Sequence, residues 1–389
     1  MKEITYKILD NLKNLPSIPN SHFSTQSKGF LTRLFGLLIK GQKSFETVEI
    51  NNINSENNKD KADNYIPKEI QTIINNKRKH KTELVFQVHD RKINLSMYHF
   101  ENISSTLLNQ HLNRIYLWLF IAIHFAPSKC SRSLRINIFF TNIKKKLPFK
   151  KEPLGTIHAN SAFTTSCNVD TEINIFREEE WFKVLVHETF HCLGLDFSEK
   201  DTEKSNASVL KLFPVKSDVR VFETYCEVWA ETINVMFIAF FQTHKNNIVK
   251  MIEKTEKMIY YERMFSLLQC TKILKHFHLT YEDLYKKDDA SNSKRVYNYK
   301  EETQILSYYI LKCIYMFHIN KYIEWCASRN GQTLNFNKDT ENIDNYINLL
   351  EILYIEPEFL SAVKKIEGVD FSKSVVLNNT LRMSVFELV

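Results

Sequence analysis

The residues of this chain best suited to chemistry lie in one short segment, Val184-Leu-Val-His187-Glu188-Thr-Phe-His191. His187 and His191 are four residues apart, so on a helix their side chains lie one above the other on the same face. This spacing allows two imidazole nitrogens to bind one Zn²⁺ ion. Glu188 projects beside such an ion, where its carboxylate can take a proton from an attacking water. The segment therefore predicts a zinc site with Glu188 as the general base.

A catalytic zinc ion needs a third protein ligand, and two segments offer one. Glu223, Glu227 and Glu231 step by four residues along an otherwise apolar stretch, where buried carboxylates would need a cation. One of them can bind the metal while a second orients a histidine. In the other segment, Gly194 can end the helix and turn the chain back, so that Asp196 approaches the metal. The third ligand is therefore Glu223, Glu227 or Asp196.

These residues resemble the zincin metallopeptidases, and among them the gluzincins, in which a helix with an ExxxD/E pattern follows the HExxH motif. Glu223-Thr-Tyr-Cys-Glu227 matches that pattern. The resemblance implies that Glu223 is the third zinc ligand and that Glu227 holds a histidine. A shifted match would make Glu227 the ligand and Glu231 its support. The stretch after His191 is longer than gluzincins usually have, so an inserted loop at 198–217 must be assumed.

The resemblance also implies where a substrate would lie. Zincins bind a peptide along an edge strand before the active-site helix, and Asn160-Ser-Ala162-Phe163 resembles the Asn-Ala-Phe strand of thermolysin-like enzymes. An extended peptide would add to this edge through main-chain hydrogen bonds. A zincin also needs a group that stabilises the oxyanion of the transition state. The candidates for that group are Tyr308, Tyr309, His276, His278 and His318.

The elements that must position these residues change in character along the chain. Apolar residues alternate in a predicted hairpin and three further strands, at 84–88, 93–97, 134–140, 155–164 and 172–176. Helical spacing predicts helices at 105–125 and, for the HExxH motif, at 179–195. The later pattern is almost entirely helical, at 217–242, 246–277, 300–327, 340–353 and 356–366. The sequence thus predicts an α+β fold, with a zincin-like mixed sheet and active-site helix followed by a mainly helical C-terminal domain.

Three regions follow from this pattern. Residues 1–80 are predicted to be a basic, partly disordered region with a polar linker at 49–66. Residues 81–200 are predicted to form the α+β subdomain with the HExxH helix, and residues 201–389 the helical subdomain that supplies the third metal ligand. In the first region, the apolar stretch 30–39 is either an amphipathic helix that binds a membrane or partner, or a helix that docks on its own domain.

Composition limits the classes of protein that remain. The 389 residues are 43% hydrophobic and 25% charged, so the chain can bury a sizeable core and bulk disorder is excluded. The net charge of +7 lies largely in lysine runs typical of solvated surfaces, and no motif predicts specific nucleic-acid binding. Seven scattered cysteines without a CxxC pair predict free thiols in a reducing compartment. With no apolar segment long enough for a membrane span, we expect a soluble, intracellular protein.

Two functions remain as hypotheses. The first is a zinc-dependent peptidase that cleaves a peptide or protein substrate by Glu-assisted attack of a zinc-bound water. The alternative is a catalytically inactive zincin-fold protein that keeps its zinc site and serves as a structural or interaction module. Residues 172–198 also resemble uncharacterised putative metallopeptidases of large DNA viruses, which implies the host cytoplasm or the virion as location. The basic residues within 1–80 leave a peripheral association with an anionic surface open.

Overall fold

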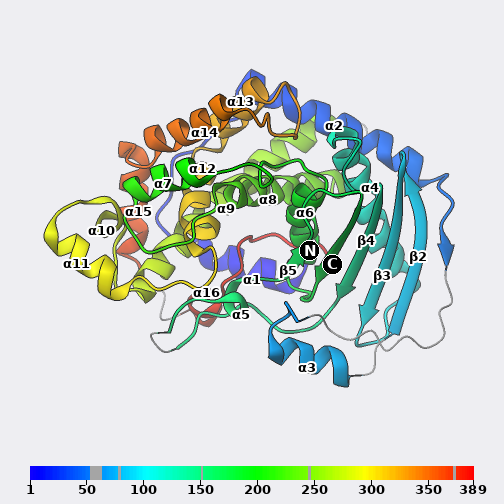
Figure 1. Cartoon of the computed structure of the whole chain (residues 1–389), viewed down its shortest axis with the longest axis horizontal. Coiled ribbons are helices and arrows are strands. Elements are labelled where there is room, and N and C mark those ends of the chain that lie inside the picture. The colour runs from blue at the N-terminus through cyan, green and yellow to red at the C-terminus, as the bar shows by residue number, and fades with distance from the viewer. Residues whose placement is uncertain (53–63, 78–79, 150–151, 244–246, 371–373) are drawn as a thin grey trace.

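The computed structural model describes residues 1–52, 64–77, 80–149, 152–243, 247–370 and 374–389. A mixed sheet lies at one side of the molecule and a mass of helices covers the other, so the fold is α+β as predicted (Figure 1). The six strands are β1 (Asn51–Asn52), β2 (His80–Val88), β3 (Arg91–His99), β4 (Ser133–Phe139), β5 (Ala162–Thr164) and β6 (Asp170–Ile175).

The strands lie in the order β1-β2-β3-β4-β6-β5. The three central strands β3, β4 and β6 are parallel, whereas β1, β2 and β5 run antiparallel to their neighbours. The β2–β3 hairpin confirms the predicted hairpin, and α4 (Ser105–Phe125), at the predicted bounds, makes the crossover from β3 to β4. The short strand β5 lies at one edge of the sheet, beside β6, which leads into the HExxH helix.

The two faces of the sheet differ in chemistry. Ile136 and Ile138 of β4 are fully buried in the main core. Between them, Asn137 faces the other way and its side-chain amide donates to Glu172 and Asn174 of β6. This alternation follows from the period of two in a strand. One face is apolar beneath the helices, whereas the other is polar around Asn137 and carries a smaller apolar cluster at Tyr98 and Phe139.

The HExxH helix α6 lies between the sheet and the helical part of the molecule, in contact with β5, β6, α4 and α8. The helices of the first half are α1 (Glu3–Leu12), α2 (Thr25–Phe45), α3 (Lys68–Asn76), α4, α5 (Thr156–Ala159), α6 (Trp181–Cys192) and α7 (Glu203–Leu212). Most of them join one continuous core, and α3 packs on a smaller cluster with residues of β3 and β4.

The second half is helical, as expected. It contains α8 (Val221–Phe241), α9 (Ile248–His276), α10 (Tyr281–Tyr285), α11 (Asp289–Asn298), the π-helical turn η1 (Leu306–Leu311), α12 (Lys312–Phe317), α13 (Ile319–Arg329), α14 (Thr340–Leu353), α15 (Pro357–Glu367) and α16 (Val375–Asn379). After α16 the segment 381–387 is buried without regular structure, and its main-chain amides donate to the carboxylates of Glu180 and Glu262.

The expectation of a poorly folded N-terminal region is wrong for α1 and α2. Ser24 caps α2 by accepting from the amide of Ser27, and apolar side chains such as Phe30 and Leu34 are buried. Because α2 contacts α4, α8, α9 and α13, its apolar face docks on its own domain rather than presenting itself to a membrane. Most of the predicted linker, 53–63, lies outside the described residues.

Two predicted elements also need correction. The segment 155–164 is not one strand, because α5 occupies its first half and only β5 pairs with the sheet. The helix expected at 300–327 is divided into η1, α12 and α13, with His318 in a non-helical conformation between the last two. Hydrophobic periodicity did not reveal these breaks. Within the described residues, the helices all fall short of the length and apolarity that a bilayer crossing needs.

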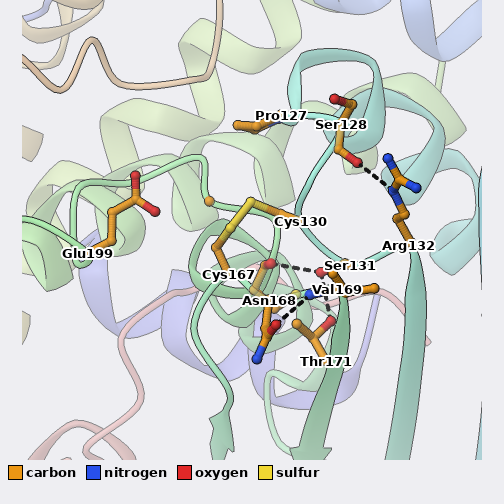
Figure 2. The surroundings of a disulfide bond; sticks show 12 residues. Pro127, Ser128, Cys130, Ser131, Arg132, Cys167, Asn168, Val169, Thr171 and Glu199 are labelled. Carbon is orange, nitrogen blue, oxygen red and sulfur yellow. Dashed lines mark hydrogen bonds between the residues drawn. A yellow bond between two sulfur atoms is a disulfide. The ribbon is translucent and has the colours of Figure 1, made fainter.

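The prediction of seven free thiols is wrong for one pair. Cys130, in the loop before β4, forms a disulfide with Cys167, in the loop before β6 (Figure 2). The two cysteines are 37 residues apart, and only the pairing of β4 with β6 brings their loops together, so their spacing gave no signal. The other five cysteines are free and buried. A disulfide is typical of oxidising compartments, so the expected reducing environment loses its support.

Candidate metal centre

The helix α6 is held rigidly by its surroundings. Every side chain from Trp181 to Cys192 is buried. The helix packs against β6 and α8, and the indole N–H of Trp118 on α4 donates to the Thr189 hydroxyl at 2.6 Å. A helix buried on all sides places polar side chains where they must find partners within the protein. His187, Glu188 and His191 therefore meet their partners in the interior.

The end of α6 turns the chain back toward His191. Gly194 has φ +62°, the left-handed conformation that favours glycine, and the Leu195 amide donates to the Phe190 carbonyl at 2.8 Å. A Cβ at Gly194 would lie 2.8 Å from Cys130 Sγ, so the disulfide also requires glycine here. The chain turns back at Gly194 as predicted, and the turn brings Asp196 beside His191.

Three candidate ligand atoms converge on one point. His187 Nε2 lies 3.1 Å from Glu223 Oε2 and 3.2 Å from His191 Nε2, and His191 Nε2 lies 3.4 Å from Glu223 Oε2. Tetrahedral zinc with bonds of 2.0–2.1 Å would space its ligand atoms about 3.3–3.4 Å apart. The observed triangle is close to one face of that tetrahedron, so these three buried side chains fit a metal ion.

The opposite ring nitrogens of both histidines face carboxylates. His191 Nδ1 lies 2.5 Å from Asp196 Oδ2, and His187 Nδ1 lies 3.0 Å from Glu227 Oε2, although that contact is too oblique for a well-aligned hydrogen bond. With the protons on Nδ1, both Nε2 atoms turn lone pairs toward Glu223, so the three converging atoms are all acceptors. Such an arrangement calls for a cation, with the rear carboxylates fixing the ligands.

The geometry thus divides the candidates for third ligand. Glu223 lies on the same side as both Nε2 atoms, whereas Glu227 and Asp196 stand behind the histidines. Glu231, one turn further along α8, instead accepts from Lys312 Nζ at 2.8 Å. The three glutamates of the stripe therefore have three different partners.

The charges of the centre are strongly coupled. Burial lowers the pKa of His187, but its contacts with Glu223 and Glu227 outweigh that effect and raise the pKa to about 9. Burial would raise the pKa of Glu223, yet the two histidines hold it well below its usual range. Without a metal, protons on the imidazoles balance the carboxylates. A bound cation would take over that role, so metal and protons compete for this site.

Glu188 lies in the wall of a cavity of about 400 Å³ that also exposes the three candidate ligands. Burial raises the pKa of this carboxyl, and the two nearby histidines oppose the rise. A carboxylate with a raised pKa is a better proton acceptor near neutral pH. Glu188 thus lies in the same cavity wall as the candidate ligands, and its role as a general base stays a prediction.

The predicted substrate strand borders the same cavity. Asn160, Ala162 and Phe163 all line it, and β5 is the edge strand of the sheet. The Asn160 carbonyl accepts from Arg177 Nε at 3.0 Å, and its side-chain oxygen accepts from the Thr303 hydroxyl at 2.8 Å. Two other segments therefore hold Asn160, which lies just before β5. β5 itself pairs with β6 along its inner side.

Among the five residues considered for oxyanion stabilisation, Tyr308 is the one in the cavity wall. It lies in η1, and its hydroxyl donates to Glu223 Oε2 at 3.3 Å. Burial and the Glu223 carboxylate raise its pKa, so the hydroxyl stays protonated and able to donate. Tyr309 instead donates to the Leu381 carbonyl in the core, and His276 bonds the Glu152 carbonyl. A π-helical turn is often found at functional sites.

Comparison with known proteins gives no match. No protein-family model, curated protein or solved structure matches this chain. The resemblance to zincins therefore rests on the residues and their geometry, and it stays a prediction.

Sequence reasoning overlooked one charged residue of the cavity wall. Lys183 lies one helical turn before His187, its side chain is 2% exposed, and its ammonium group contacts Glu227. The signal was present in the sequence. A lysine on the same helical face as His187, between Phe182 and Val184, had to find a buried acidic partner.

Proposed function

We propose that this protein is a zinc-dependent peptidase. The observation that carries the proposal is the triangle of His187 Nε2, His191 Nε2 and Glu223 Oε2, with sides of 3.1–3.4 Å. It lies in the wall of a cavity bordered by an edge strand. A bound zinc ion would supply a Lewis acid for the substrate carbonyl and would make a water more acidic.

The protein's own side chains supply the remaining functions. The Glu188 carboxylate accepts the proton of the attacking water and passes it to the nitrogen of the leaving amine. The Tyr308 hydroxyl, held beside Glu223, donates to the oxygen on which negative charge develops. Glu227 and Asp196 keep the two imidazoles oriented.

The substrate class follows from the border of the cavity. An extended peptide can add to the outer edge of β5 through main-chain hydrogen bonds, which any sequence can make. Ala162 presents little side chain there, so the peptide backbone can approach closely. We therefore propose a peptide or a flexible protein segment as substrate.

Glu188→Gln tests this function directly. We expect hydrolysis of a peptide library to fall about 10²–10⁴-fold, because the amide cannot accept the proton. The zinc content, measured by elemental analysis, should stay at the wild-type level, since Glu188 is not one of the three converging side chains. Glu253→Gln, the same change at an exposed position of α9, is the matched control and should leave both readouts unchanged.

Two results would contradict the proposal. Equal hydrolysis by the wild type and Glu188→Gln would exclude this mechanism. A wild-type protein that binds zinc but cleaves no member of the library would favour the alternative, a zincin-like structural or interaction protein.

A further inference from the structure

We infer that Lys183 is a positioning residue of the metal centre, because its ammonium group fixes the charge and place of the carboxylate behind His187. The inference rests on the proposed metal site, yet nothing in the HExxH motif assigns a role to this lysine. It concerns a chain of contacts that runs from Lys183 through Glu227 to Nδ1 of His187. Nε2, on the other side of the imidazole, belongs to the candidate metal site.

The three side chains contact one another in sequence, from Lys183 to Glu227 to His187. Lys183 Nζ bonds Glu227 Oε1, and the other oxygen of the same carboxylate lies 3.0 Å from His187 Nδ1. Lys183 and Glu227 are each 2% exposed, so water screens this ion pair little. The carboxylate thus has a cation on one oxygen and faces the imidazole Nδ1 with the other.

Other elements hold the lysine in place. The Met383 sulfur lies 3.6 Å from Lys183 Nζ, on the buried segment that follows α16. The Glu180 carboxylate also faces it and pairs with Lys145, so Lys145 and Lys183 each have an acidic partner of their own. Lys183 therefore has one short bond, to Glu227, and little freedom to leave it.

Removing the cation would change what Glu227 can do. Without Lys183, no cation fixes the place of the Glu227 carboxylate, so its other oxygen is free to leave His187 Nδ1. The imidazole then loses the group that orients Nε2 toward the candidate metal site. Lys183 acts on the metal site through Glu227, and it does not contact the candidate ligands itself.

The molecule contains a matched pair for comparison. Lys312 and Glu231 form a second buried pair, with side chains 0% exposed, one turn further along α8. Lys312 Nζ also donates to the Met383 carbonyl, so both lysines join α8 to the same segment. Glu231 contacts neither His187 nor His191 among the interactions recorded for the described residues. The two pairs thus share burial and chemistry, and they differ in contact with the metal site.

The experiment measures zinc affinity by competition with a chromogenic chelator, beside urea unfolding of the metal-free proteins. We expect Lys183→Met to weaken zinc binding about 10–100-fold. Lys183→Arg, which keeps the charge, should restore most of that loss. Lys312→Met should lose comparable stability and keep zinc affinity within about threefold of the wild type, because it acts on the fold alone.

A double-mutant cycle shows whether the lysine acts through the carboxylate. In a Glu227→Gln background, Lys183→Met should cause no further loss of zinc affinity. This double variant has no unpaired buried charge, so it serves even if Lys183→Met alone fails to fold. Equal zinc affinity in Lys183→Met and Lys312→Met would overturn the inference, as would fully additive effects in the cycle. A wild type that binds no zinc would instead overturn the proposed function on which the inference rests.

Discussion

The two histidines of the candidate metal centre are held in different ways. His191 is oriented by Asp196, which follows five residues later after the turn at Gly194. His187 is oriented by Glu227 from another helix, and that carboxylate depends in turn on Lys183. One half of the site is thus built from a continuous stretch of chain, and the other half from separate segments.

This difference tells us which half depends on tertiary structure. The turn after α6 places Asp196 by main-chain hydrogen bonds within one short segment. The half around His187 needs α6, α8 and the segment after α16 to be packed together. We therefore expect a substitution in the long-range half to lower fold stability more than the matching substitution in the local half, while both weaken metal binding.

The largest expected effect comes from Glu227→Gln. It removes the negative charge that pairs with the buried Lys183 ammonium, which costs about 3–5 kcal/mol of unfolding free energy. Asp196→Asn removes the carboxylate partner of the His191 imidazole and leaves no buried lysine unpaired. It should therefore lower the free energy of unfolding by about 1–3 kcal/mol. Each substitution should weaken zinc binding about 10–100-fold, because each removes the carboxylate behind a ligand. Urea unfolding of the metal-free proteins and chelator competition measure the two quantities, and equal stability losses would remove the distinction between the two halves.

A smaller effect is expected from the disulfide, which lies against the local half. Reduction of Cys130–Cys167 releases a loop of 37 residues and should lower the free energy of unfolding by about 2–4 kcal/mol. Gly194 packs on Cys130 Sγ, and the turn at Gly194 places Asp196 beside His191. Reduction of the disulfide should therefore also weaken zinc binding. Urea unfolding with and without a thiol reductant measures the change. The Cys130→Ser/Cys167→Ser variant is the control in which reductant should have no effect, and an unchanged wild-type midpoint would contradict the prediction.

The smallest effect is the pH dependence of stability and zinc binding that arises from His187, in the long-range half of the site. The pKa of His187 is about 9 in the folded, metal-free protein, above its ordinary value of about 6.5. Its contribution to stability is therefore fully present below about pH 6.5 and is lost as the pH rises through about 9. Zinc must displace that proton, and the pKa of His191 is raised as well, so zinc binding should tighten as the pH rises, by at least about tenfold per unit below pH 9. Chelator competition at several pH values tests this, and a flat profile would show that no proton is displaced.

The sequence allowed prediction where the signal is local. The HExxH spacing, the helix break at Gly194 and the alternation in β4 follow from residues a few positions apart, and the structure contains each of them. The acidic stripe on α8 was also visible, because a period of four on an apolar helix leaves carboxylates that need partners.

What could not be predicted depends on contacts between distant segments. The roles of Glu223, Glu227 and Asp196 were left open because only packing of α6 against α8 decides which oxygen faces Nε2. The Cys130–Cys167 pair depends on strand pairing, and the burial of α2 depends on the surfaces of four other helices. In each case the sequence contains the groups, and the fold determines which of them meet.

The buried segment after α16 has a consequence for the order in which the protein is made. Met383 and Ser384 donate their amides to Glu180 at 3.0 and 2.7 Å, and Val385 donates to Glu262 at 2.8 Å. The ribosome adds these residues only after every helix from α1 to α16. Until then the nascent chain holds two interior carboxylates without these partners, and Lys183 without the neighbouring sulfur. We therefore expect the half of the site around His187 to mature only after the segment 381–387 has been synthesised, later than the turn that holds His191.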